Sequence, residues 1–232
     1  MDDREIAKSA ALEQRHWWYA ERRALVRRTV SAWPAGRAVD VGCAGGGNTA
    51  VLRELGWEVT GLEHNAEGAR IAASRGLAVV RGDARRLPFA DASVDLVLST
   101  DVWEHIEDDE TVARETVRVL RRGGRALVAV PCDPALWSGH DEALGHVRRY
   151  ERAELLDVIT RAGLEVEHAW SWNVLLRPVV KARRRGRHHS RSEMEPVHPA
   201  LNAALRGTVA LERFLPLGRL PGVSLVVSAR KP

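Results

Sequence analysis

The chain has 232 residues, 45% of them hydrophobic, which is enough for one substantial core and leaves one large domain or one domain with an appendage open. No run of about 18 apolar residues occurs, and the charged start MDDREIAKSA lacks the apolar centre of a signal peptide, so we expect a soluble, cytoplasmic protein. Cys43 and Cys132 lie far apart and without metal-ligand spacing, which indicates buried free thiols.

The net charge of +4 is unevenly distributed. Residues 181–191, KARRRGRHHSR, contain one lysine, five arginines and no acid, so the remainder of the chain carries −2. This balance argues against a surface that binds nucleic acid throughout. Contact with a membrane surface or a partner through 181–191 stays open.

Short segments rich in valine, leucine and alanine alternate with helical patterns. Such segments are typical of buried parallel strands, and we predict strands over 37–43, 58–63, 77–81, 94–100 and 125–131. Asn65 and Asp108 can cap helices that follow them, and Gly56, Gly76, Gly123 and Gly124 can end helices. Repeated right-handed crossovers would build an open sheet with helices on both faces, whose ligands bind beyond the carboxyl ends of the strands.

A glycine-rich turn, within AVDVGCAGGGNT at 38–49, follows the first predicted strand. A dinucleotide fingerprint would need glycine in place of Ala44, and no G-K-[ST] follows to form a Walker loop. Asp40, Gly42, Ala44 and Gly46 fit D-x-G-x-[GA]-x-G instead. Because Asp40 would repel a pyrophosphate but could hold an amino group, directly or through water, the ligand should be nucleoside-like with an ammonium or sulfonium.

Two further acids end predicted strands. Glu63 lies about 20 residues beyond the glycine turn, where a carboxylate can accept both ribose hydroxyls. Asp83 ends the third strand, where its carboxylate can accept from an exocyclic adenine amino group. Three acids at successive strand ends together indicate a nucleoside site.

These residues resemble the class I S-adenosylmethionine-dependent methyltransferases, in particular a bacterial small-molecule branch. The match runs from about 37 to 132 through VDVGCAGGGNT, GLEHN, GDARRLPF, DASVDLVLSTDVWEHI and VLRRGGRALVAVP. The resemblance implies a Rossmann-like methyltransferase fold of α/β class: a mostly parallel seven-stranded sheet with helices on both faces, in which strands over 164–172 and 223–231 form an antiparallel hairpin. It implies S-adenosyl-L-methionine as cofactor, with the candidate binding residues Asp40, Gly42, Ala44, Gly46, Glu63, His64, Asp83, Ala84, Thr100, Asp101 and Trp103.

The N-terminal stretch EQRHWWYAERRALVRR looks like the opening helix of that bacterial branch, and we expect residues 1–36 to form a helical cap. Tyr19 could close over the cofactor, since an aromatic face near a sulfonium gives cation–π attraction, and Trp17 could contact the substrate. Arg22 or Arg23 could reach the methionine carboxylate. The alternative is that the tryptophans only pack and the arginines are solvated.

The segment after the fifth strand, PCDPALWSGHDEALGHVRRY, should overhang the active-site mouth. For a hydroxyl or amine acceptor, His140 and His146 are suitable bases and Asp141 could orient one of them. His146 could instead hold the loop closed. A metal site of His140, Asp141 and His146 is conceivable, but we predict no metal.

The same segment offers candidate substrate contacts, and similar loops occur in the bacterial branch. Trp137 could stack on a flat acceptor, and Arg149 and Tyr150 are further candidates for substrate binding. A surface role for the arginine is the alternative.

We divide the chain into the cap, a cofactor-binding domain of 37–172 and 223–232, and an insertion over 173–222 that holds the basic segment and the apolar pattern PALNAALRGTVALERFLP. The insertion could set substrate specificity, act as a lid or contact a partner; a solvated loop with a packed helix is the alternative.

We therefore expect a methyltransferase that acts on a small or medium metabolite, by O-methylation in secondary metabolism. The alternatives are base-assisted ring closure (cyclopropanation) of a sulfonium adduct, a non-catalytic binding or regulatory protein, and a nucleic-acid methyltransferase. The last lacks an N-P-P-Y-like motif.

Overall fold

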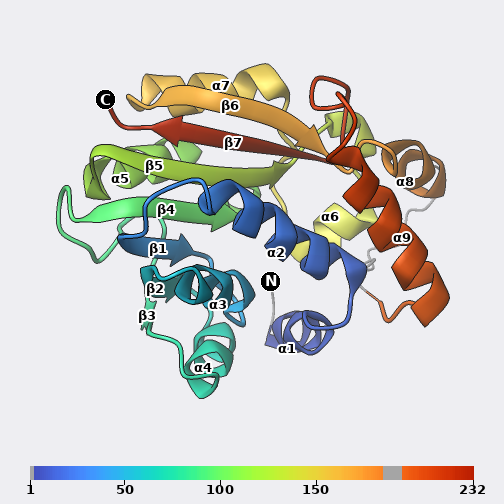
Figure 1. The fold of residues 1–232 in the computed structure, drawn as a ribbon, viewed down its shortest axis with the longest axis horizontal. Coiled ribbons are helices and arrows are strands. Elements are labelled where there is room, and N and C mark those ends of the chain that lie inside the picture. Colours follow the sequence, from blue (N-terminus) through green and yellow to red (C-terminus); the bar gives the residue numbers. More distant parts are fainter. Residues whose placement is uncertain (1–2, 185–194) are drawn as a thin grey trace.

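The computed structural model describes residues 3–184 and 195–232, arranged around one seven-stranded sheet (Figure 1). The strand order is β3-β2-β1-β4-β5-β7-β6, parallel from β3 to β5, with β7 antiparallel to both of its neighbours. This confirms the predicted Rossmann-like methyltransferase fold and its C-terminal hairpin. The strands are β1 (Arg37–Val41), β2 (Glu58–Glu63), β3 (Val79–Arg81), β4 (Val94–Thr100), β5 (Leu120–Pro131), β6 (Glu165–Trp172) and β7 (Ser224–Arg230).

Helices cover both faces of the sheet because its central strands are buried on both sides (Figure 1). Val39 and Val97 face a core formed with α5 (Asp109–Val119) and α7 (Arg152–Arg161). Ala38 and Leu96, one residue earlier, face the opposite core, formed with α2 (Trp17–Val30), α3 (Gly47–Glu54) and α9 (Pro199–Glu212). The side-chain period of two thus divides each strand between two cores.

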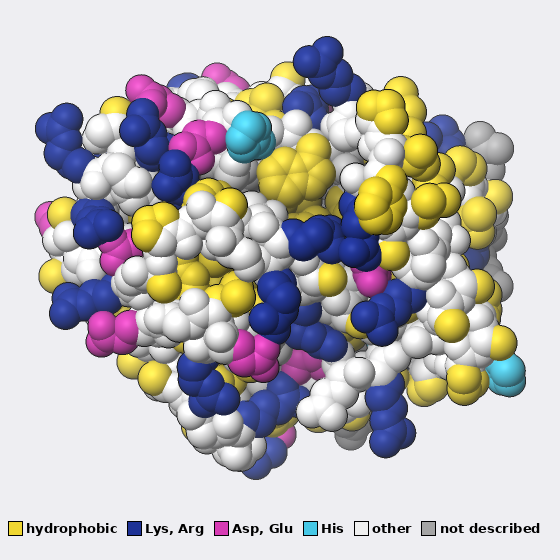
Figure 2. Space-filling view, viewed as in Figure 1, with side chains coloured by type: hydrophobic (Ala, Val, Ile, Leu, Met, Phe, Trp, Pro, Cys, Tyr) yellow, Lys and Arg dark blue, Asp and Glu magenta, His cyan; other side chains and the backbone are white. Residues whose placement is uncertain are grey.

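The shorter elements surround the carboxyl ends of the strands. They are α1 (Asp3–Leu12), which contacts α4 (Ala66–Ser74), the 3₁₀ turns η1 (Trp103–His105) and η2 (Pro134–Leu136), and α6 (Gly139–Leu144) and α8 (Arg177–Arg184). The helices α8 and α9 lie between β6 and β7 in the chain, where the insertion was predicted, whereas residues 185–191 of the basic segment lie outside the described residues. Apolar side chains are exposed on the surface around α9 (Figure 2), but no described helix has the length and apolar character that crossing a membrane requires.

The helix caps agree with the sequence, with one exception. The Asn65 side chain accepts from the amides of the first turn of α4, and Asp108 caps α5 in the same way. The predicted stop at Gly123 and Gly124 is wrong: α5 ends at Val119, and both glycines lie inside β5. Leu120 is already paired with β4, so sheet pairing ends the helix before the glycines are reached. The predicted free, buried cysteines are confirmed.

Candidate active site

A cavity of about 880 Å³ opens at the carboxyl ends of β1, β2 and β4. Its wall is built from the glycine turn, the α1–α2 cap, the loop that carries α6, and the insertion. A second hollow, of about 460 Å³, lies at the opposite end of the sheet around Arg37 and Asp95 and contains none of the predicted site residues. The larger cavity is therefore the candidate site.

The glycine turn is held in a conformation that glycine favours. Gly42 and Gly46 have φ of +70° and +84°, and a Cβ on either would collide with a neighbouring side chain. Ala44 also has a positive φ, of +45°, which is uncommon for a residue with a side chain. Gly42 and Ala44 line the cavity, whereas Gly46 lies behind it as the N-cap of α3.

Glu63 ties this turn to the end of β2. One carboxylate oxygen accepts from the Ala44 amide at 2.7 Å, and the other accepts from the Asn65 amide at 2.8 Å. The side chain is buried but lines the cavity, next to His64. Because each oxygen retains a lone pair, the carboxylate can hold the turn and still accept from a ligand.

Asp83 and Ala84 line the cavity at the end of β3. The Asp83 carboxylate accepts from Arg85, with Nη2 to Oδ2 at 2.6 Å, and this hydrogen bond lowers the pKa of Asp83. The carboxylate is therefore ionised at neutral pH and can accept from an amino group.

Asp40 does not reach the cavity wall. It is 1% exposed and accepts a 2.6 Å hydrogen bond from the Thr49 hydroxyl, beneath the glycine turn. Burial raises the pKa of Asp40 to about 7. The structure thus places Asp40 as a support of α3 and the turn rather than beside the ligand space.

The segment after β4 divides between the cavity and the core. Thr100 and Asp101 line the cavity, whereas Trp103 is fully buried in the core beneath it. Asp101 has φ of +55°, and its Oδ2 lies 2.5 Å from Nη1 of Arg22. This ion pair joins the cap to the end of β4.

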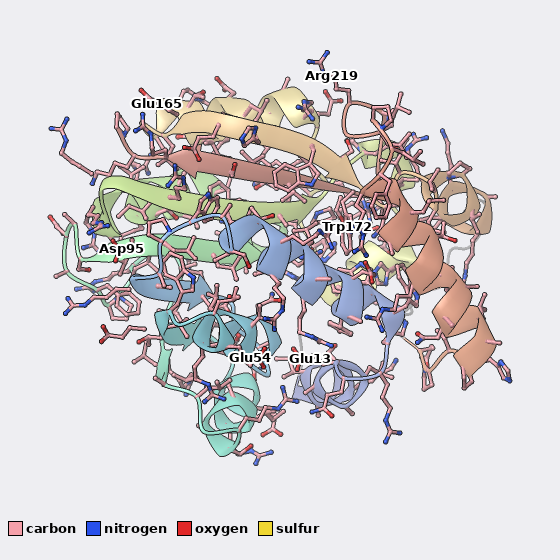
Figure 3. The ribbon with its side chains drawn as sticks, in the orientation of Figure 1. Glu13, Glu54, Asp95, Glu165, Trp172 and Arg219 are labelled. Atoms are coloured by element: carbon pink, nitrogen blue, oxygen red, sulfur yellow. The ribbon has the colours of Figure 1, made fainter. Side chains whose placement is uncertain are left out.

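The cap places aromatic rings around that ion pair. The Arg22 guanidinium lies 4.4 Å from the ring centroid of Trp18 and 4.9 Å from that of Trp172, at the end of β6 beside α9 (Figure 3). Trp17 and Tyr19 line the cavity, and burial raises the pKa of Tyr19 to about 12. Tyr19 therefore faces the ligand space as a neutral phenol.

The cap also reaches the glycine turn through Glu13, which projects from the end of α1 toward α3 and α4 (Figure 3). Arg75 donates to the Glu13 carboxylate and to the Gly45 carbonyl, both at 2.5 Å. The sequence contained no signal for this bridge.

The histidine loop, residues 132–150, is ordered by one buried carboxylate. Asp141 is fully buried; its Oδ1 lies 2.9 Å from Nδ1 of His146 and accepts from Nε of Arg149 at 2.7 Å. Hydrogen bonds and these charges lower the pKa of Asp141 to about 2 although burial opposes them. His140, His146 and Arg149 line the cavity, so Asp141 orients residues that face the ligand space without facing it itself.

Two predicted substrate contacts lie elsewhere. Trp137 is 40% exposed and outside the cavity wall. Tyr150 is fully buried, and its hydroxyl donates to Asp109 at 2.6 Å. Since its ring packs in the α5–α7 core, Tyr150 supports the loop from below.

Two ionisable residues of η1, Glu104 and His105, line the cavity although the sequence analysis gave them no role. They face His146: the His105 and His146 ring centroids are 4.7 Å apart, and a Glu104 oxygen lies 3.9 Å from Nε2 of His146. The adjacent acid and histidine in DVWEHI were the available signal.

Known proteins are similar to this chain in sequence and in architecture. The model of a methyltransferase domain family matches residues 39–128. A probable S-adenosylmethionine-dependent methyltransferase of Mycolicibacterium smegmatis is 31% identical over 160 residues, or 67% of this chain and 62% of the relative, so the chain spans less than two thirds of that relative.

Two solved structures show the same fold. An S-adenosylmethionine-dependent methyltransferase from Mesorhizobium loti superposes with a TM-score of 0.64 at 19% identity, over 94% of this chain and 100% of the other. A geranyl diphosphate methyltransferase in complex with S-adenosylmethionine gives a TM-score of 0.65 at 16% identity, over 92% and 86%.

Proposed function

We propose that this chain, of which residues 39–128 match a methyltransferase domain family, is an S-adenosylmethionine-dependent methyltransferase. It binds this cofactor in the cavity of about 880 Å³ and methylates a hydroxyl of a small or medium metabolite there. The observation that carries the proposal is the division of one cavity into two chemically different ends. The glycine turn, Glu63 and Asp83 form one end, and the histidine loop with the insertion forms the other.

The first end suits the cofactor. Glu63 accepts hydrogen bonds from the ribose hydroxyls. Asp83 accepts a hydrogen bond from the adenine amino group, and Ala84 contacts the adenine. The amides and small side chains of Gly42 and Ala44 leave room for the methionine portion, and Tyr19 closes over it from the cap.

The second end suits an acceptor with both apolar and polar parts. Leu176, Val180 and Leu205 of the insertion supply apolar parts of the cavity wall, and His140 and His146 supply polar parts. In the transfer, the acceptor oxygen attacks the methyl carbon, the carbon–sulfur bond breaks, and its electron pair stays on sulfur to give S-adenosylhomocysteine. An imidazole of the histidine loop takes the acceptor proton, since methyl transfer to a hydroxyl must release one.

Calorimetry with S-adenosylmethionine, S-adenosylhomocysteine and NAD tests the cofactor. We expect binding of the first two and none of NAD; tighter binding of NAD would overturn the proposal. Incubation with cofactor deuterated in its methyl group and with bacterial metabolite extracts, followed by mass spectrometry, tests the reaction. O-methylation retains all of the methyl deuterium in the product, whereas ring closure loses part of it.

The histidine loop is tested by His140→Ala and His146→Ala. Loss of the proton acceptor should lower turnover by about 10²- to 10⁴-fold with little change in cofactor affinity. Full activity in both single variants and in the double variant would leave alignment alone to explain catalysis.

A further inference from the structure

Three side chains from two separate segments converge in the cavity wall. Glu104 and His105 come from η1, directly after β4, and His146 comes from the loop after α6. One oxygen of Glu104 and one nitrogen of each histidine all lie within 4.8 Å of one another. All three residues line the cavity at its acceptor end.

Each imidazole is held by its Nδ1 atom, which directs Nε2 away from that partner. Nδ1 of His146 lies 2.9 Å from Asp141 Oδ1, and Nδ1 of His105 lies 3.2 Å from the Gly145 carbonyl oxygen. Carboxylate and carbonyl oxygens can only accept, so both Nδ1 atoms carry hydrogen and both Nε2 atoms of the neutral rings carry a lone pair. Metal-binding histidines are typically oriented by such contacts.

Glu104 provides the carboxyl group of the cluster. Its side chain is fully buried, and neither carboxylate oxygen has a hydrogen-bond partner among the described residues. The nearby guanidinium groups are engaged elsewhere, Arg22 by Asp101 and Arg149 by Asp141. A buried carboxyl group without a partner either stays protonated or pairs with a cation, and an ion in this cluster would be that cation.

We propose that Glu104, His105 and His146 bind one divalent transition-metal ion of the zinc type. Two imidazoles and one carboxylate suit such an ion and leave further positions open for water or a substrate oxygen. Ligands bound at about 2.1 Å in tetrahedral geometry lie about 3.4 Å apart. Glu104 and Nε2 of His146 are 3.9 Å apart, and all three ligand atoms lie within 4.8 Å of one another, so binding the ion requires them to approach by up to about 1.4 Å.

The site differs from the metal set that the sequence suggested. Asp141 cannot be a ligand together with His146 in this arrangement, because it is engaged with the Nδ1 side of that ring and with Arg149. Glu104 takes its place, and His140 remains outside the set.

Binding of the ion does not depend on the proposed function. The catalytic role of the ion, however, rests on the proposed function. An acceptor hydroxyl on an open metal position has a lowered pKa. Its proton passes to His140, because the lone pair of His146 is used by the ion. The resulting oxygen anion attacks the methyl carbon of the sulfonium, and the carbon–sulfur electron pair leaves with S-adenosylhomocysteine.

The test uses the untagged full chain, stripped with a chelator and titrated with Zn²⁺ by calorimetry and with Co²⁺ by visible absorption. We expect one equivalent of each, with a Co²⁺ spectrum typical of tetrahedral or five-coordinate nitrogen and oxygen ligation. Glu104→Gln and His146→Ala should each weaken Zn²⁺ binding by at least about 100-fold, and Asp141→Asn by about 10- to 100-fold. His140→Ala is the matched control and should bind Zn²⁺ as the wild type does.

S-adenosylhomocysteine binding, measured on every variant, shows that the fold is intact. No stoichiometric Zn²⁺ binding by the wild type, or equal loss in His140→Ala and His146→Ala, would overturn the metal site. If the metal fails to bind while the cofactor binds and the methyl group is transferred, the proposed function stands without it. If the metal binds but the cofactor does not, the metal site stands and the proposed function falls.

Discussion

The replacement Glu63→Gln probes the link between the glycine turn and β2. The Glu63 carboxylate accepts from the backbone amides of Ala44 and Asn65 at 2.7 and 2.8 Å. Glutamine has the same shape but offers one oxygen and one NH₂ group. One of the two backbone amides would therefore lose its acceptor and face a donor, and the other would keep only a neutral hydrogen bond.

The expected losses of stability and of ligand affinity in Glu63→Gln follow from the strengths of these hydrogen bonds. A hydrogen bond to a charged group contributes about 1.5 to 3 kcal/mol, and a neutral bond contributes about 1 kcal/mol less. Since Glu63 is 8% exposed, hydrogen bonds to water can replace little of the lost hydrogen-bond energy. Glu63→Gln should lower the free energy of unfolding by about 2 to 4 kcal/mol, which a domain of ordinary stability survives. Loss of a ribose contact should weaken S-adenosylhomocysteine by a further factor of about 10 to 150.

Urea unfolding and calorimetry of the same preparations measure the two effects separately. Glu67→Gln is the control: Glu67 lies on α4 outside the cavity and pairs with Arg70 at the surface, so neither quantity should change measurably. Unchanged unfolding in Glu63→Gln would refute the role of the two amide contacts. Lower stability with unchanged ligand affinity would remove Glu63 from the ribose site and leave it as a support of the turn.

Three further variants test the other assignments. Asp83→Ala should weaken S-adenosylhomocysteine by about 1.5 to 3 kcal/mol in calorimetry, whereas Asp91→Ala, which also removes a surface ion pair but lies outside the cavity, should not. Tyr150→Phe should cost about 1 to 3 kcal/mol in urea unfolding, because buried Asp109 loses a donor, while acceptor KM stays constant; a raised KM at unchanged stability would restore its predicted substrate role. Burial raises the pKa of Asp40 to about 7, so its stability contribution is complete below its unfolded pKa near 3.8 and is lost as pH rises through 7. As the pH rises from 3 to 8, Asp40→Asn should thus gain up to about 4 kcal/mol of stability over the wild type and level off above pH 7; a pH-independent difference would refute the shift.

Strand positions could be predicted because burial on both faces produces continuous apolar segments. The segments β2 and β4 begin and end at the predicted residues. Continuous apolar segments do not predict whether the side chain at the end of a strand points into the cavity or away from it. Asp40 shares the face of Ala38, toward α2 and α3, so it lies under the turn, whereas Glu63 and Asp83 at the ends of the next strands line the cavity.

Contacts between distant segments left little trace in the sequence. Trp172 was predicted only as a strand residue, yet its ring lies against the Arg22 guanidinium that pairs with Asp101. Glu104 and His105 stood inside DASVDLVLSTDVWEHI, a stretch used only for its resemblance to the methyltransferase family, and the approach of His146 from the histidine loop brings the three together. The sequence of one segment does not show which residue of a distant segment will pack against it in the fold.

The same long-range contacts join the cap and the insertion into one cover over the cavity. Asn202 on α9 accepts from the Trp17 amide at 2.8 Å, and buried Glu21 on α2 accepts from Arg206 of α9 at 3.2 Å. The helix that lines the cofactor end is therefore attached to the helix that supplies Leu205 to the acceptor end. Because the two proposed ends share this cover, we expect a change in the insertion to alter cofactor affinity as well as acceptor preference.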